Sequence, residues 1–141
     1  MRVVADTNVL VSAAIKPNGR FATQLRQGTF TLLVSDAVLN ELIDVLNRPH
    51  LRQKYNLTPQ YIHVYLHLIR VRSEYVEPTE TITACRDEKD NKFLELAVAG
   101  QAEVLVSNDV DLLVLHPFRS VPIVSVADLW GFLATFQTPD D

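Results

Sequence analysis

Four acidic side chains stand where the chain is expected to pass between strands and helices. Asp6 and Asp109 each follow an apolar run, Glu41 lies one turn into an expected helix, and Asp90 opens another. In a parallel α/β sheet, residues just past the carboxyl ends of strands converge on one edge, where ligands usually bind. Carboxylates crowded together repel one another unless a cation lies among them. The pattern therefore indicates a site for a hard divalent metal ion, and with it metal-assisted phosphate chemistry.

Two or three carboxylates can hold one or two Mg²⁺ or Mn²⁺ ions and leave positions for water and phosphate. Short polar side chains nearby, namely Thr7, Asn8 and Ser107, are suited to orienting the carboxylates or the attacking water. The chain offers no serine or cysteine nucleophile with a convincing histidine partner. It also lacks a P-loop and a G-x-G-x-x-G run, which argues against nucleotide binding through a glycine-rich loop.

Taken singly, each acid has an ordinary explanation, because carboxylates are good helix N-caps. Asp90 is the clearest exception. On a helix from Asp90 to Gly100 it falls within the apolar arc, whereas Lys92 and Glu95 point away. Asp87 would cap that helix equally well, in a capping or supporting role, which leaves Asp90 for function. The types and order of the acids together, rather than any one of them, favour a site.

The elements that must position these residues alternate between short apolar strands and amphipathic helices. Strands are expected over 2–6, 31–35, 104–107 and 122–125, with an edge strand over 74–78 and a loop over 79–87. Helices are expected over 7–15, 20–26, 36–46, 90–100 and 126–135, and a long one starts at Pro59 with Thr58 as its N-cap. Arg48-Pro49 is interpreted as a break. This alternation predicts a three-layer α/β sandwich, with a central parallel sheet covered by helices on both faces.

Length and composition fit this expectation. A chain of 141 residues suits a single domain, expected over 1–136, with a frayed tail over 137–141. With 48% hydrophobic and 21% charged residues it belongs among soluble globular proteins, and no apolar run reaches the roughly 20 residues of a membrane helix. The chain start does not resemble a secretory signal. A lone Cys85 excludes an internal disulfide and suits a reducing cytoplasm.

The net charge of −4 argues against a nucleic-acid partner, but the charges are unevenly distributed along the chain. No acid occurs between Thr7 and Ser35 or between Val45 and Ser73, and both stretches carry bases. They present a basic flank beside an acidic pocket, or simply solvated helices whose charges happen to be basic; sequence alone leaves both open. The candidates for contact with a phosphate backbone are Lys16, Arg20, Arg48, Arg52 and Lys54.

With the acids in this order, the chain resembles PIN-domain proteins over nearly its whole length. The matching segments are 4–10, 35–42, 87–97 and 104–113. The resemblance implies an Mg²⁺- or Mn²⁺-dependent endoribonuclease in which Asp6, Glu41, Asp90 and Asp109 bind metal. Asp111 would help or replace Asp109, and Thr7, Asn8 and Ser107 would support the acids. Ser107 stands where the family commonly has threonine.

The nearest likeness is to the bacterial branch described as toxins of toxin–antitoxin systems, which implies a small antitoxin partner and a homodimer. One alternative is a catalytically silent PIN-like module that binds RNA or protein, although all four acids are present. Another is a metal-dependent phosphatase. Aspartyl-nucleophile phosphatases require Asp-x-Asp after the first strand, and here the sequence reads Asp6-Thr7-Asn8.

Overall fold

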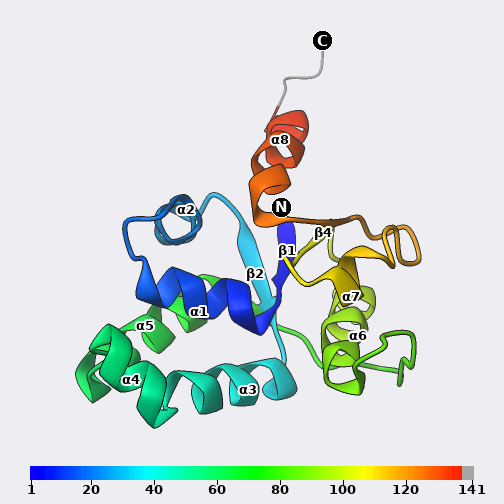
Figure 1. Ribbon diagram of the computed structural model, residues 1–141. Helices are drawn as coiled ribbons and strands as arrows, with labels where there is room; N and C mark the ends of the chain where they lie inside the picture. Colours follow the sequence, from blue (N-terminus) through cyan, green and yellow to red (C-terminus); the bar gives the residue numbers. More distant parts are fainter. Residues whose placement is uncertain (138–141) are drawn as a thin grey trace.

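A five-stranded, wholly parallel sheet forms the centre of the molecule, with helices on both faces (Figure 1). The computed structural model describes residues 1–137. The strand order is β3-β2-β1-β4-β5, so β1 lies in the middle. The strands are β1 (Arg2–Ala5), β2 (Thr31–Val34), β3 (Ser73–Tyr75), β4 (Val104–Val106) and β5 (Ile123–Val124). This confirms the predicted parallel α/β sandwich.

The central strands form because they are short, continuous apolar runs that are covered on both faces, as is typical of parallel sheets. Every residue of β4 is buried, and so are the last three of β1. Since side chains alternate along a strand, Val3 and Ala5 belong to one core and Val4 to the other. The sheet thus divides the interior into two apolar layers.

The helices are distributed unequally between these layers. The larger core packs β1, β2 and β4 against α1, α2, most of α3, α5 and α8, and the smaller core packs the other face against α6 and α7. The helices are α1 (Thr7–Ile15), α2 (Arg20–Gln27), α3 (Asp36–Leu46), α4 (Pro49–Tyr55), α5 (Pro59–Val71), α6 (Asn91–Ala99), α7 (Val110–Leu113) and α8 (Val126–Gln137), with a 3₁₀ turn, η1 (Glu88–Asp90), before α6. Within residues 1–137, every helix is too short or too polar to cross a bilayer.

The expected helix signals are found where the sequence places them. The Ser35 hydroxyl accepts a hydrogen bond from the backbone N–H of Val38 at 3.3 Å and caps α3. Thr58 caps α5 in the same way, with Pro59 at the first helical position. Gly28 ends α2 in the left-handed conformation, with φ +72°, which glycine adopts without strain.

Two expectations differ from the structure, and a third falls largely outside the residues that it describes. The edge strand is β3, Ser73–Tyr75, displaced toward the N-terminus from the predicted 74–78. Arg48-Pro49 is not a simple break, because α4 begins there with Pro49 in its first turn, where a missing N–H costs nothing. The frayed tail expected over 137–141 lies outside the described residues, except that Gln137 ends α8.

The strand order places a ligand site at one point of the sheet. The chain adds β2 on one side of β1, whereas β4 pairs with β1 on the other side. In open parallel sheets, this reversal leaves a crevice outside the carboxyl ends of the two strands, and ligands bind there. Asp6 directly follows β1, and Ser107 directly follows β4. The structure thus brings the first and last of the predicted motifs to the crevice.

Candidate functional site

All four acids line one pocket of about 590 Å³ at this crevice. They arrive from different segments of the chain: Asp6 from the end of β1, Glu41 from α3, Asp90 from the start of α6, and Asp109 from the loop after β4. The other residues lining the pocket are Thr7, Asn8, Asp44, Val45, Arg48, Asp87, Lys89, Lys92 and Phe93.

Asp6 combines a structural and a site role. It is 4% exposed, and its Oδ1 accepts a hydrogen bond from the Val9 N–H at 2.9 Å, which caps α1. The other carboxylate oxygen, Oδ2, accepts a hydrogen bond from the Ser107 hydroxyl. Burial raises the pKa of Asp6; these two hydrogen bonds oppose the rise, and repulsion from Asp109 and Glu41 adds to it. Asp6 therefore caps α1 and also lies in the pocket, and its role in binding metal stays a prediction.

Ser107 joins the ends of β1 and β4. Its hydroxyl is fully buried, donates to Asp6 and accepts a hydrogen bond from the backbone N–H of Asp109 at 2.9 Å. Asp109 then caps the short helix α7 by accepting from the Asp111 N–H at 2.9 Å. One buried hydroxyl thus contacts the carboxylate of Asp6 and the backbone of Asp109, and so joins the two acids across the crevice.

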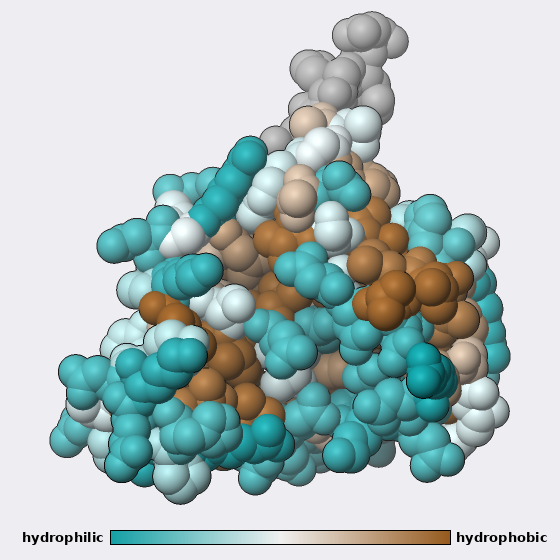
Figure 2. All heavy atoms as spheres, viewed as in Figure 1, coloured by the Kyte–Doolittle hydropathy of each residue, from teal (hydrophilic) through white to brown (hydrophobic). Residues whose placement is uncertain are grey.

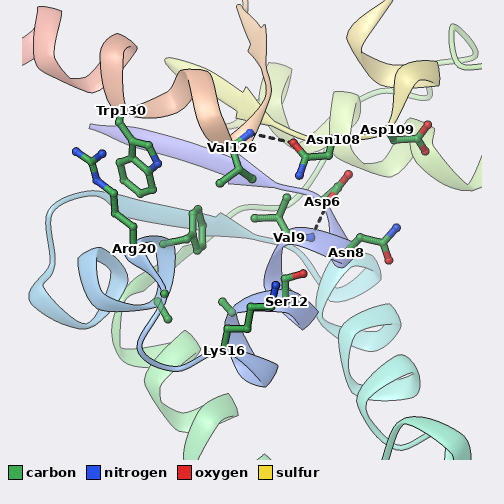
Figure 3. A pocket seen from close by; sticks show the side chains of 14 residues that line it. Asp6, Asn8, Val9, Ser12, Lys16, Arg20, Asn108, Asp109, Val126 and Trp130 are labelled. Atoms are coloured by element: carbon green, nitrogen blue, oxygen red, sulfur yellow. Dashed lines mark hydrogen bonds between the residues drawn. The ribbon is translucent and has the colours of Figure 1, made fainter. Parts of the chain in front are cut away.

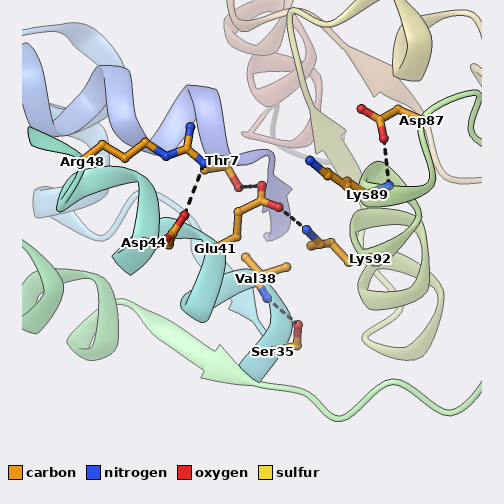
Figure 4. A network of polar contacts seen from close by, with 9 residues as sticks. All are labelled: Thr7, Ser35, Val38, Glu41, Asp44, Arg48, Asp87, Lys89 and Lys92. Carbon is orange, nitrogen blue, oxygen red and sulfur yellow. Dashed lines mark hydrogen bonds and ion pairs between the residues drawn. The ribbon is translucent and has the colours of Figure 1, made fainter. Parts of the chain in front are cut away.

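Glu41 is held by two partners (Figure 4). The Thr7 hydroxyl donates to one carboxylate oxygen, and the Lys92 ammonium pairs with the other. The helical pattern places Lys92 outside the apolar arc of α6, yet its long side chain reaches from the first turn of α6 to α3 and lines the pocket. Sequence reasoning missed this residue, because residues two apart on a helix point in different directions and the spacing from Asp90 gives no signal.

Asp87 and Asp90 divide the roles that the sequence predicts for them. Asp87 caps η1 by accepting from the Lys89 N–H at 3.0 Å. Within residues 1–137, the Asp90 side chain caps no helix. Burial and repulsion from Asp109, Asp87, Asp6 and Glu41 raise the pKa of Asp90 to about 6. A carboxyl group with this pKa, in a pocket of carboxylates, is typical of a functional site.

Asn91, another residue that sequence reasoning missed, anchors the loop that precedes Asp90. Its side-chain oxygen is buried and accepts backbone hydrogen bonds from Ala84 at 3.2 Å and from Cys85 at 2.8 Å. This fastens the predicted 79–87 loop to the start of α6. The buried Cys85 contributes packing there.

The remaining candidates separate into those near the acids and those away from them. Asp111 lines neither the acid pocket nor the pocket beside it, so it does not share the place of Asp109. Arg48 lines the acid pocket and pairs with Asp44 at 3.3 Å. The predicted phosphate contacts Lys16 and Arg20 line the neighbouring pocket, whereas Arg52 and Lys54 line neither of the two.

Comparisons with known proteins agree with this geometry. The family model described as PIN domain matches residues 2–111, which is most of the chain. This protein belongs to the PIN-domain family. Members of that family are generally nucleases that use divalent metal ions.

Individual relatives extend the comparison. The chain is 32% identical over 119 residues to the uncharacterized protein MJ1680 of Methanocaldococcus jannaschii, covering 82% of this chain and 76% of that protein. Its fold is similar to that of PAE2754 from Pyrobaculum aerophilum, with a TM-score of 0.59, 15% identity, and coverage of 96% and 90% of the two chains. It is also similar to VapBC2 from Rickettsia felis, solved bound to a DNA fragment from its promoter, with a TM-score of 0.58, 17% identity, and coverage of 89% and 98%. The sequence relative is archaeal, so a bacterial source stays a prediction.

The acids of this PIN domain suit a cation by their chemistry. Carboxylate oxygens are the ligands that Mg²⁺ prefers. Burial is the largest cause of the raised pKa values of Asp6 and Asp90, and repulsion from the other acids adds to it. Within residues 1–137, no three Asp, Glu, His or Cys side chains are arranged to hold one ion together as they stand. Mg²⁺ keeps several of its waters, however, and is commonly held through only one or two carboxylates.

The raised pKa of Asp90 makes the stability of the metal-free PIN domain depend on pH. Between about pH 4 and pH 6, the folded protein binds this proton more tightly than the unfolded chain does, so the free energy of unfolding falls as pH rises through the window. After discounting for partial exposure, we expect about 1 kcal/mol from Asp90. Thermal melts of wild type and Asp90→Asn in EDTA measure it: the variant should lose less stability between pH 4.5 and 7. Parallel pH profiles would contradict this expectation.

Lys92 supplies one positive charge to the PIN-domain acids when metal is absent. Replacing it with glutamine leaves Glu41 facing the other carboxylates without its ammonium partner. Because the pair is only partly buried, we expect the free energy of unfolding in EDTA to fall by about 1–2 kcal/mol. Lys89→Gln is the matched control, since Lys89 is exposed in the same pocket. Chemical denaturation with and without Mn²⁺ measures the free energy of unfolding. Saturating Mn²⁺ should reduce the difference in this free energy between Lys92→Gln and wild type. Equal losses of stability in Lys92→Gln and Lys89→Gln would contradict the role of Lys92.

Proposed function

We propose that this PIN domain is a metal-dependent endoribonuclease that hydrolyses RNA phosphodiester bonds with Mg²⁺ or Mn²⁺. The observation that carries the proposal is the convergence of Asp6, Glu41, Asp90 and Asp109 in one pocket at the point where the strand order reverses. The family match and the intact set of acids favour catalysis over a silent binding module.

In this proposal one or two of the carboxylates of Asp6, Asp90 and Asp109 would hold the ion directly, and the others would act through its bound waters. Glu41 would join them or orient the attacking water. When bound, the ion lowers the pKa of a coordinated water and offsets charge on the phosphate oxygens. Ser107 keeps the carboxylate of Asp6 and the backbone of Asp109 in place, as supporting hydrogen bonds do around metal sites.

Basic side chains flank the acids on two sides. Arg48 lines the acid pocket, and Lys16 and Arg20 line the adjoining one. Such contacts neutralise phosphates and position the strand without reading its sequence. The overall negative charge of the chain is therefore compatible with an RNA substrate, because these bases lie beside the site.

We further propose that the chain is the toxin of a toxin–antitoxin pair, is held by a small antitoxin protein, and forms a homodimer in the cytoplasm. The likeness to VapBC2, solved with promoter DNA, supports this assignment through the fold. Light scattering coupled to gel filtration tests the dimer, which would have twice the 15.9 kDa chain mass. Co-purification of the product of an adjacent small gene tests the antitoxin.

The decisive experiment is cleavage of a long structured RNA by the purified protein, with Mn²⁺ and with EDTA, beside Asp6→Asn prepared identically. Cleavage that requires Mn²⁺ and is lost in the variant supports the nuclease. A chromogenic phosphomonoester in parallel separates it from a phosphatase. Equal RNA cleavage by wild type and Asp6→Asn would indicate a contaminating nuclease. RNA binding without cleavage would indicate a binding module. Either result would contradict the proposal.

A further inference from the structure

A second pocket, of about 450 Å³, opens directly beside the acids between α1, α2 and α8 (Figure 3). The two pockets share Asp6, Asn8 and Asp109 as lining residues, so they adjoin and one extended ligand could occupy both. Figure 2 shows apolar atoms in the middle of this face, below α8, with hydrophilic atoms around them. The function proposed above uses only the cations Lys16 and Arg20 of this pocket and gives its apolar wall no role.

The walls of the second pocket are apolar and partly aromatic. The apolar residues lining it are Val9, Ala13, Phe21, Ala22, Val126 and Trp130. The rings of Phe21 and Trp130 pack edge to face with centroids 6.5 Å apart. The Arg20 guanidinium lies over the Trp130 ring, 4.5 Å from its centroid. Such a wall offers planar, π-bearing surfaces held in place by their neighbours.

Polar groups surround the mouth of the pocket. Asn8, Ser12 and Lys16 follow one another at four-residue spacing along α1, so they line the same side. Asn108 lies opposite: its side-chain oxygen accepts from the Val126 N–H at 3.0 Å, and its amide nitrogen faces the pocket in Figure 3. With Arg20, the rim therefore carries two cations and hydrogen-bonding amides.

We propose that this pocket is a base-binding subsite: it receives one unpaired base of the RNA, next to the phosphate held at the acids. The inference rests on the proposed function and adds to it the pocket that would hold the base. Sites for single strands combine bases stacked on aromatic or arginine planes with cations along the backbone. Here the apolar wall takes the base, and Lys16 and Arg20 contact the flanking phosphates. A base paired in a duplex cannot leave its stack to enter without an energetic cost.

Continuity and charge favour RNA over a protein segment as the occupant. The pocket opens into the acids through Asp6 and Asp109, where a phosphodiester would have to lie for cleavage. The two cationic side chains of the pocket, Lys16 and Arg20, lie on the side away from the acids, at a place suited to the next phosphates of the same RNA strand. An apolar peptide would need neither cation.

The chain carries its own reporter, because Trp130 is the single tryptophan. In EDTA, where cleavage is suppressed, we expect a short single-stranded oligoribonucleotide to quench Trp130 emission. The same strand with one abasic position, or paired into a duplex, should not quench. Loss of one stacked base typically costs roughly 5- to 150-fold in affinity, so an abasic position should weaken binding by about tenfold, measured by fluorescence anisotropy.

A variant that fills the pocket provides the second test. Ser12 is exposed on α1, so Ser12→Leu should fold normally while placing a larger apolar group in the pocket; Ser12→Ala is the matched control. Ser12→Leu should lose the quenching and cut single-stranded RNA about tenfold more slowly. The rise in melting temperature on adding Mn²⁺ should persist, since the acids are unchanged.

The outcomes distinguish this inference from the nuclease proposal. Metal-dependent cleavage with no Trp130 quenching, or with Ser12→Leu as active as Ser12→Ala, would overturn the base pocket and leave the nuclease standing. Quenching that Ser12→Leu abolishes, in a protein that never cuts RNA, would support the pocket and overturn the nuclease. Quenching by an antitoxin peptide but not by RNA would assign the pocket to a protein and overturn the inference.

Discussion

Asp90→Asn should abolish RNA cleavage, with a loss on the order of 10³-fold or more, and leave the protein folded. The amide has nearly the shape of the carboxylate but lacks the charge that a metal ion requires. Because Asp90 caps no helix within residues 1–137 and its carboxylate is crowded by other acids, the variant should be at least as stable as wild type in EDTA. Initial cleavage rates and thermal melts in EDTA measure the two effects.

Two further variants sharpen this prediction. Asp6→Asn should be equally inactive yet still folded, since asparagine caps a helix as well as aspartate does and can accept from the Val9 N–H. Asp111→Asn should cut within about threefold of wild type, because its side chain lines neither pocket and surface changes cost within about 0.5 kcal/mol. Should Asp90→Asn unfold, or Asp111→Asn be as inactive as Asp90→Asn, the assignment of the acids would be wrong.

Ser107→Ala should lower cleavage by about 10- to 100-fold although Ser107 itself touches no substrate. Removing the hydroxyl leaves a buried oxygen of Asp6 without its donor and the Asp109 N–H without its acceptor. We expect the free energy of unfolding to fall by about 1–3 kcal/mol. The Mn²⁺ dependence of the rate measures the effect at the site: half-saturation should move to higher Mn²⁺, since the carboxylates are less well fixed.

Ser107→Thr is the matched control. Threonine keeps the hydroxyl and adds one methyl group to a fully buried position. We expect a stability cost of about 1 kcal/mol with the half-saturating Mn²⁺ concentration unchanged. An alanine variant whose Mn²⁺ dependence equals that of wild type, with only its melting temperature lowered, would make Ser107 a packing residue rather than one that positions the acids.

Much of this molecule follows from local sequence. Short apolar runs become strands because they can be buried on both faces, and Thr58 with Pro59 marks the start of α5. The alternation of strand and helix predicts the parallel sheet, and a parallel sheet brings the residues after its strands to one edge. The sequence alone therefore predicts that Asp6 and Asp109 lie together, that Asp87 serves as a cap, and that Asp90 is left for function.

Other features depend on which elements the fold brings together. Lys92 reaches Glu41 only because α6 packs across the crevice from α3, and no helical periodicity within α6 could show that. Asp111 lies outside the acid pocket because it belongs to the short helix α7, which begins directly after Asp109. The base pocket needs α8, from the far end of the chain, to place Trp130 beside Arg20. Local propensities determine the elements, whereas long-range packing decides which side chains of distant elements meet.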